Sequence, residues 1–81
     1  HMEKADQELL LQLVPNNPDL KRLYDEHVEL EKEIEKLERY SQFSASIEIE
    51  NKAIKKRKLR GMDNIMAILE NYRQTQNVTM Q

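Results

Sequence analysis

The spacing of apolar residues predicts that the chain is helical. From position 20 onward, these residues recur at alternating intervals of three and four, the heptad spacing of helices that pack along a seam. One row of the heptad holds Leu20, His27, Ile34 and Ser41, and the other holds Leu23, Leu30 and Leu37. We therefore predict a straight helix over residues 18–40, with the imidazole of His27 on its apolar side.

Breaking and capping residues set where this helix begins. Pro15 interrupts the apolar run that precedes it, so a separate short helix is expected over residues 3–14. Asn17 is suited to be the N-cap of the second helix, with Pro18 at the first helical position. The sequence thus predicts a sharp boundary between two helices at this point.

A serine-rich segment, residues 41–46, predicts a turn, and either Ser44 or Ser46 is suited to cap the helix that follows. That third helix is predicted over residues 47–73, and the polar, aperiodic residues 74–81 are expected to be a flexible tail. Its apolar residues form two adjacent rows: Ile54, Ile65, Ile68 and Tyr72 in one, and Leu59, Met62, Met66 and Leu69 in the other. Two rows indicate two packing partners for this helix.

Together these elements predict a single all-α domain over residues 1–81. Because the turn is short, we expect the two long helices to form an antiparallel, coiled-coil-like two-helix hairpin, with the short N-terminal helix beside them.

Charge favours the same antiparallel register. Residues 25–38 carry seven acids and two lysines, whereas residues 52–60 carry six bases and no acid. Folding at the turn sets residues whose numbers sum to about 87 opposite one another, which places the acidic stretch beside the basic one. The six bases are Lys52, Lys55, Lys56, Arg57, Lys58 and Arg60. We predict that they pair mainly with the acidic helix; binding of nucleic acid or another anionic surface is the weaker alternative.

Composition limits both the core and the chemistry. The chain has 81 residues, 38% hydrophobic and 35% charged, with one Gly and no Cys. No disulfide can form, and no apolar run approaches the roughly 18 residues of a membrane span, so we expect a soluble, cytoplasmic protein. His1 and Met2 resemble a cloning scar rather than a natural start, so no function is expected of them. A core this small predicts self-association, most simply a dimer, or a protein partner.

The function predicted from these features is that of a non-enzymatic scaffold or adaptor module. Its predicted interaction surface consists of Leu9, Leu13, Met62, Met66 and Leu69. No nucleophile motif or glycine-rich phosphate loop occurs, so no catalytic residue and no cofactor is predicted.

His27 is the residue whose chemistry invites a sharper interpretation, because an unperturbed imidazole titrates near neutral pH. We interpret it as a hydrogen-bonded residue of the helix seam. A metal site is the lesser alternative, since it would need further ligands, for which Glu31 and Asp63 are the candidates.

Several positions also resemble a known family. They are Asn17-Pro18, Leu23-Tyr24-Asp25-Glu26-His27 with Leu30, and Ile54-Lys55-Lys56-Arg57-Lys58-Leu59-Arg60 with Asp63 and Ile65. Together they are similar to the YdcH-like family of small bacterial proteins of unknown function. The resemblance implies a bacterial, cytosolic helical hairpin with a short leading helix, and it brings no known reaction. The family pattern has a large apolar residue where Gly61 stands. We hypothesise that Gly61 makes room for the ring of His27 or Tyr24; the alternative is that it marks a bend.

Overall fold

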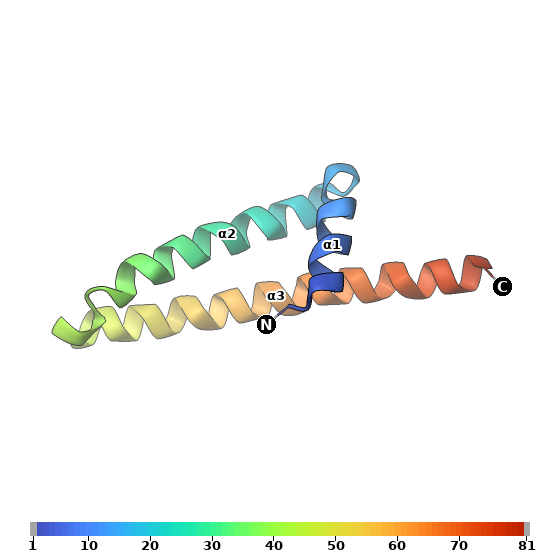
Figure 1. Cartoon of the computed structure of the whole chain (residues 1–81). Coiled ribbons are helices and arrows are strands. Elements are labelled where there is room, and N and C mark those ends of the chain that lie inside the picture. Colours follow the sequence, from blue (N-terminus) through green and yellow to red (C-terminus); the bar gives the residue numbers. More distant parts are fainter. Residues whose placement is uncertain (1, 81) are drawn as a thin grey trace.

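All regular secondary structure is helical over the residues that the computed structural model describes, which are positions 2–80, with side chains at positions 2–76 (Figure 1). Its elements are α1 (Lys4–Leu13), the 3₁₀ turn η1 (Val14–Asn16), α2 (Pro18–Glu38), the 3₁₀ turn η2 (Ser41–Phe43) and α3 (Ala45–Met80). The predicted all-α class is confirmed, and the described residues contain no strand.

The boundary between α1 and α2 follows the local chemistry of the sequence. Asn17 has extended backbone geometry, and its side-chain oxygen accepts a hydrogen bond from the Leu20 N–H at 3.1 Å. Pro18 occupies the first helical position, where its missing N–H removes no helical hydrogen bond. The predicted cap and start of α2 are confirmed.

The turn between α2 and α3 resolves which serine caps the last helix. The Ile47 N–H donates to the Ser44 hydroxyl oxygen at 3.4 Å, whereas Ser46 already lies inside α3. The helix therefore begins at Ala45, two residues before the predicted start, with Ser44 as its cap.

The C-terminal end of α3 differs from the prediction. A tail was expected from residue 74, yet the helix continues through Met80, and only position 81 of that segment lies outside the described residues. No Gly or Pro follows Gly61 to stop the helix. Thr75 adapts to it because its hydroxyl donates to the Asn71 carbonyl one turn earlier, at 2.9 Å.

The three helices meet at one end of the molecule, which we call the three-helix end: α1, residues 18–24 of α2 and residues 65–73 of α3. Its buried core cluster is Leu10, Leu20, Ile65 and Leu69. Arg73 of α3 bonds Asp6 of α1 at 2.8 Å and ties the short helix across the long one. Figure 1 shows α1 crossing α3 beside the start of α2.

The remaining length of α2 lies against α3, and we call this part the two-helix end: residues 26–38 of α2 and 47–59 of α3. In Figure 1 the chain turns at η2 and α3 runs back along α2. Leu30 and Ile34 are buried here, and ion pairs cross between the helices from Glu38 to Lys55 at 2.8 Å and from Glu26 to Arg57 at 3.9 Å. Acidic and basic stretches thus meet as the charge pattern predicts.

This arrangement leaves the chain elongated. Its radius of gyration is 15.7 Å and its extents are 57 × 20 × 18 Å. A compact domain of 81 residues would have a radius of gyration of about 12 Å. Two helices without a third layer enclose little volume, so much of each helix stays open to solvent.

Candidate functional site

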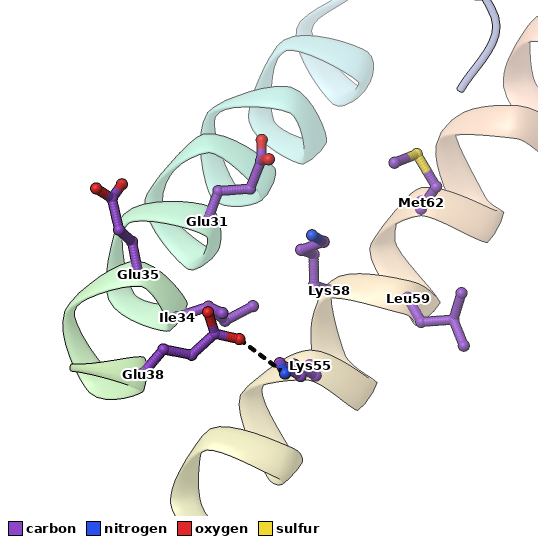
Figure 2. Close-up of a pocket in the computed structure, with 8 residues that line it drawn as sticks. All are labelled: Glu31, Ile34, Glu35, Glu38, Lys55, Lys58, Leu59 and Met62. Atoms are coloured by element: carbon purple, nitrogen blue, oxygen red, sulfur yellow. Dashed lines mark ion pairs between the residues drawn. The ribbon is translucent and has the colours of Figure 1, made fainter. Parts of the chain in front are cut away.

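A groove runs along one side of the interface between α2 and α3, and we call it the α2–α3 groove. Its section at the two-helix end, drawn in Figure 2, has a volume of about 540 Å³. It is lined by Glu31, Ile34, Glu35 and Glu38 of α2 and by Lys55, Lys58, Leu59 and Met62 of α3. The heptad spacing of α2 sets Ile34 in the floor and leaves the acids on the rim.

The groove continues to the three-helix end. A second section, of about 500 Å³, is lined by Met2, Gln7, Leu10, Leu11, Tyr24, His27, Val28, Glu31, Lys58 and Met62. Because Glu31, Lys58 and Met62 line both sections, the two are parts of one groove. Residues of α1 form the end of this groove, and its apolar lining suits another helix better than it suits a small polar molecule.

The two rims of the groove carry opposite charges. Figure 2 shows Glu31, Glu35 and Glu38 on α2 and the lysines on α3. Lys55 pairs with Glu38 at 2.8 Å, and the hydrogen bond and charge of Lys55 together hold the pKa of Glu38 below its ordinary value. Among the described residues, Lys58 makes no ion pair, although its charge also lowers the pKa of Glu38 slightly.

His27 lies in this groove with 13% of its side chain exposed. Its Nε2 lies 3.0 Å from the Glu31 Oε1 one turn along α2, so the predicted position in a helix seam comes with a polar partner. The other ring nitrogen, Nδ1, is buried and has no hydrogen-bond partner within the described part of the chain. Among the same residues, no three His, Cys, Asp or Glu side chains are arranged to hold a metal ion.

Gly61 does not make the room that was hypothesised. A methyl group built on its Cα meets nothing within 4 Å, so neither His27 nor Tyr24 fills the space beside it. The side chains of α3 that share the groove with His27 are instead Lys58 and Met62.

The predicted apolar interaction surface is divided by the fold. Leu69 has no exposed surface and belongs to the core cluster, so its assignment to a surface for a partner is wrong. Leu9, Leu13 and Met66 are half-buried and pack against the same cluster. The reason is that α1 covers part of the α3 stripe. Of the five predicted residues, Met62 lines the α2–α3 groove.

The predicted basic run is also divided. Lys55 and Arg57 reach across to acids of α2, and Lys52 pairs with Glu48 on its own helix at 3.3 Å. Within the described chain, Lys56 and Arg60 are exposed and lie in no ion pair. The run is therefore partly neutralised by its own fold.

Asn51 is a buried polar residue that the apolar pattern did not reveal. It is 95% buried in α3, and its side-chain oxygen has no hydrogen-bond partner among the described residues. The signal was its position, four residues after Ile47 and three before Ile54, which places it on the inward row. Apolarity alone could not place it there.

Comparisons with protein-family models, with curated proteins and with solved structures found no match to this chain. The resemblance to the YdcH-like family therefore stays a prediction that rests on the residues quoted for it. No helix within the described residues is both long enough and apolar enough to cross a membrane.

Proposed function

We propose that the chain is a non-enzymatic protein-interaction module, of scaffold or adaptor type, that self-associates through a helix face. Its fold in this proposal is an antiparallel, coiled-coil-like hairpin whose open side needs a partner. The resemblance to the YdcH-like family is the basis for expecting a bacterial, cytoplasmic protein, and these remain predictions.

One observation carries the proposal. The chain exposes 6333 Å² of surface at a mass of 9.7 kDa. A compact monomer of that mass would expose about 5,100 Å². The excess of about 1,200 Å² exceeds the roughly 800 Å² that each partner buries in an interface of standard size. Burial in an assembly is the ordinary way for a short chain without disulfides to gain stability.

Light scattering across a concentration series tests this proposal, at low salt and at about 0.5 M salt, where surface charges are screened beyond a few ångströms. We expect the mass of a dimer at both salt concentrations, because apolar burial persists when charges are screened. A monomer throughout the series would contradict the proposal.

A variant pair localises the surface. Met62→Glu places a charge in the α2–α3 groove and should abolish self-association, whereas Ala67→Glu places the same charge at an exposed position of α3. Ala67→Glu should keep the dimer. Equal effects of the two substitutions would show that the groove is not the contact surface.

A second candidate function is weak binding to nucleic acid or another anionic surface through residues 52–60. The observation that favours it is that Lys56 and Arg60 are exposed and form no ion pair with any described residue. Binding to DNA or RNA that falls steeply with salt and is lost in Lys55/Lys56/Arg57→Glu would support it. Binding that survives that triple substitution would contradict it.

A further inference from the structure

We infer that the α2–α3 groove is occupied by a second copy of the chain, turned about a twofold axis parallel to the helices, so that α2 of each copy lies on α3 of the other. The inference rests on the proposed self-association. It adds which surfaces meet and in which direction they run.

Apolar side chains along the groove supply the area for this contact. Leu59 is 61% exposed on the α3 side, and Leu11 is 57% exposed where α1 forms the end of the groove. Met62 lines both sections of the groove and is half-buried. A pair of helices packed on this groove would cover all three residues and bury part of the excess surface area of the monomer.

Opposite charges stand at the same level on the two rims. Glu31 of α2 and Lys58 of α3 line both sections of the groove, so they lie at the same height along it. Glu31 contacts His27, and Lys58 lies in no ion pair among the described residues. Each rim can therefore accept an opposite charge from outside the chain.

These charges decide between the two face-to-face twofold arrangements. An axis across the helices would set α2 on α2 and α3 on α3, with acids against acids and bases against bases. An axis along the helices sets the acidic rim of each copy on the basic rim of the other, with Glu31 facing Lys58 twice. Like charges across an interface are repulsive, so the second arrangement is favoured.

The direction of the helices is compatible with this arrangement, and the choice itself rests on the charges. Because α2 and α3 run in opposite directions (Figure 1), each helix of such a dimer has antiparallel neighbours on both sides. This is the geometry of a four-helix bundle, and the helix dipoles of neighbours oppose one another favourably. The η2 turns of both copies then lie at the same end, which brings the exposed Phe43, at 76%, near its counterpart.

A charge exchange tests the pairing of the rims. Glu31→Lys and Lys58→Glu should each raise the dissociation constant of the dimer at least tenfold, since each substitution creates two like-charge contacts. Mixing the two variants should restore a dimer, because both contacts of the mixed pair are again attractive. Within each variant chain the like charges remain, so only contacts between chains can explain the recovery.

Glu29→Lys is the matched control, because Glu29 is exposed on α2, lines neither section of the groove and, among the described side chains, forms an ion pair with Lys32 alone, at 3.5 Å. It should dimerise as the wild type does. If all three variants dimerise as the wild type does, or if mixing restores nothing between folded variants, the arrangement is overturned while self-association stands. A wild-type chain that is monomeric at every concentration overturns both proposals.

The direction of the two copies is measured independently of those variants. Gln42 is exposed in η2 and the chain has no Cys, so Gln42→Cys accepts a single spin label. Labels at the same end of a bundle whose helices lie 8–10 Å apart should be separated by about 10–25 Å. A separation approaching the 57 Å length of the chain would place the turns at opposite ends and overturn the inference.

Discussion

At the three-helix end, α1 lies across α2 and α3, and Ile65 has no exposed surface. At the two-helix end, the same two long helices lie together without α1, and Ile34 keeps 8% of its surface exposed beside an open groove. At both ends, the apolar stripe of α2 packs against the apolar stripe of α3. The two ends differ by the third helix, α1, whose apolar side chains cover a side of the pair that neither long helix covers.

This difference shows how little core two packed helices make by themselves. Each of two packed helices buries one stripe of side chains and leaves the positions beside that stripe, which we call its flanks, open to solvent. On α3 the open flank holds Leu59 and Met62. At the three-helix end the same flank of α3 holds Met66 and Leu69, and α1 covers it. The two-helix end is therefore where a partner adds most burial.

The largest expected effect comes from emptying the two cores with the same substitution. Ile65→Ala should lower the free energy of unfolding by about 3 kcal/mol, because it leaves a cavity among three helices. Ile34→Ala should lower it by about 1–2 kcal/mol, since the open groove lets neighbouring side chains and water relax into the space. Urea unfolding followed by circular dichroism, at dilutions where the chain is monomeric, measures both. Equal losses would show that the two ends are equally well enclosed.

The next largest effect on stability is expected from breaking the ion pair between α1 and α3. Asp6 is 14% exposed and accepts the Arg73 hydrogen bond at 2.8 Å, so Asp6→Asn should lower the free energy of unfolding by about 1 kcal/mol. Asp25→Asn is the matched control. Its partner Lys21 is also at 2.8 Å, but both side chains are more than half exposed, and the loss should stay below about 0.5 kcal/mol. A larger loss for Asp25→Asn would contradict the role assigned to α1.

Asn51 is a buried polar residue of the two-helix end, and an apolar replacement would make the core there as apolar as that of the three-helix end. Asn51→Leu replaces a buried amide oxygen that has no hydrogen-bond partner among the described residues by an apolar side chain. The amide also hydrogen bonds Glu38, but Glu38 keeps its ion pair with Lys55, so the substitution should raise the free energy of unfolding by about 1 kcal/mol. Thermal unfolding of the variant beside the wild type measures the change. A loss of stability would show that the amide makes a necessary bond at this position, as buried polar residues that fix helix register do.

Gly61 lies in α3 between the two ends and has open space beside it. Gly61→Ala should raise the free energy of unfolding by about 0.5–1 kcal/mol, because an added methyl meets nothing within 4 Å and reduces the freedom of the unfolded chain. Chemical unfolding with unchanged slope is the measurement. A loss would mean that this position needs the small residue after all.

The sequence predicted those features that depend on neighbouring residues in the chain. Asn17 caps α2 because its side chain reaches an N–H three residues away, and that arrangement is local. The contact from Asp6 to Arg73 spans 67 positions, and no local pattern contains it. Choosing between Ser44 and Ser46 also needed the structure, since both carry a hydroxyl near the same helix start.

The candidate site shows the same division between pattern and packing. Periodicity placed Met62, Met66 and Leu69 on one face of α3, but it could not tell that α1 would bury Leu69 and leave Met62 in a groove. Apolarity could not find Asn51, because burial of an amide depends on what surrounds it. A helical row identifies side chains that share a face, and only the neighbouring helix decides which of them remain exposed.

The smallest expected effect is a pH dependence confined to the two-helix end. Lys55 holds the pKa of Glu38 below its ordinary value, so the pair stabilises the fold above that value. The contribution is lost as the pH falls through the ordinary Glu pKa of about 4.3 and then through the lower pKa of the folded state. We therefore expect Lys55→Gln to be less stable than the wild type at pH 7, with the difference shrinking as Glu38 is protonated. Lys56→Gln removes the same charge from an exposed position that forms no ion pair within the described part of the chain. Its difference from the wild type should change less over that pH range. Parallel slopes for the two variants would show that the general charge of the basic run, rather than the pair between α2 and α3, carries the effect.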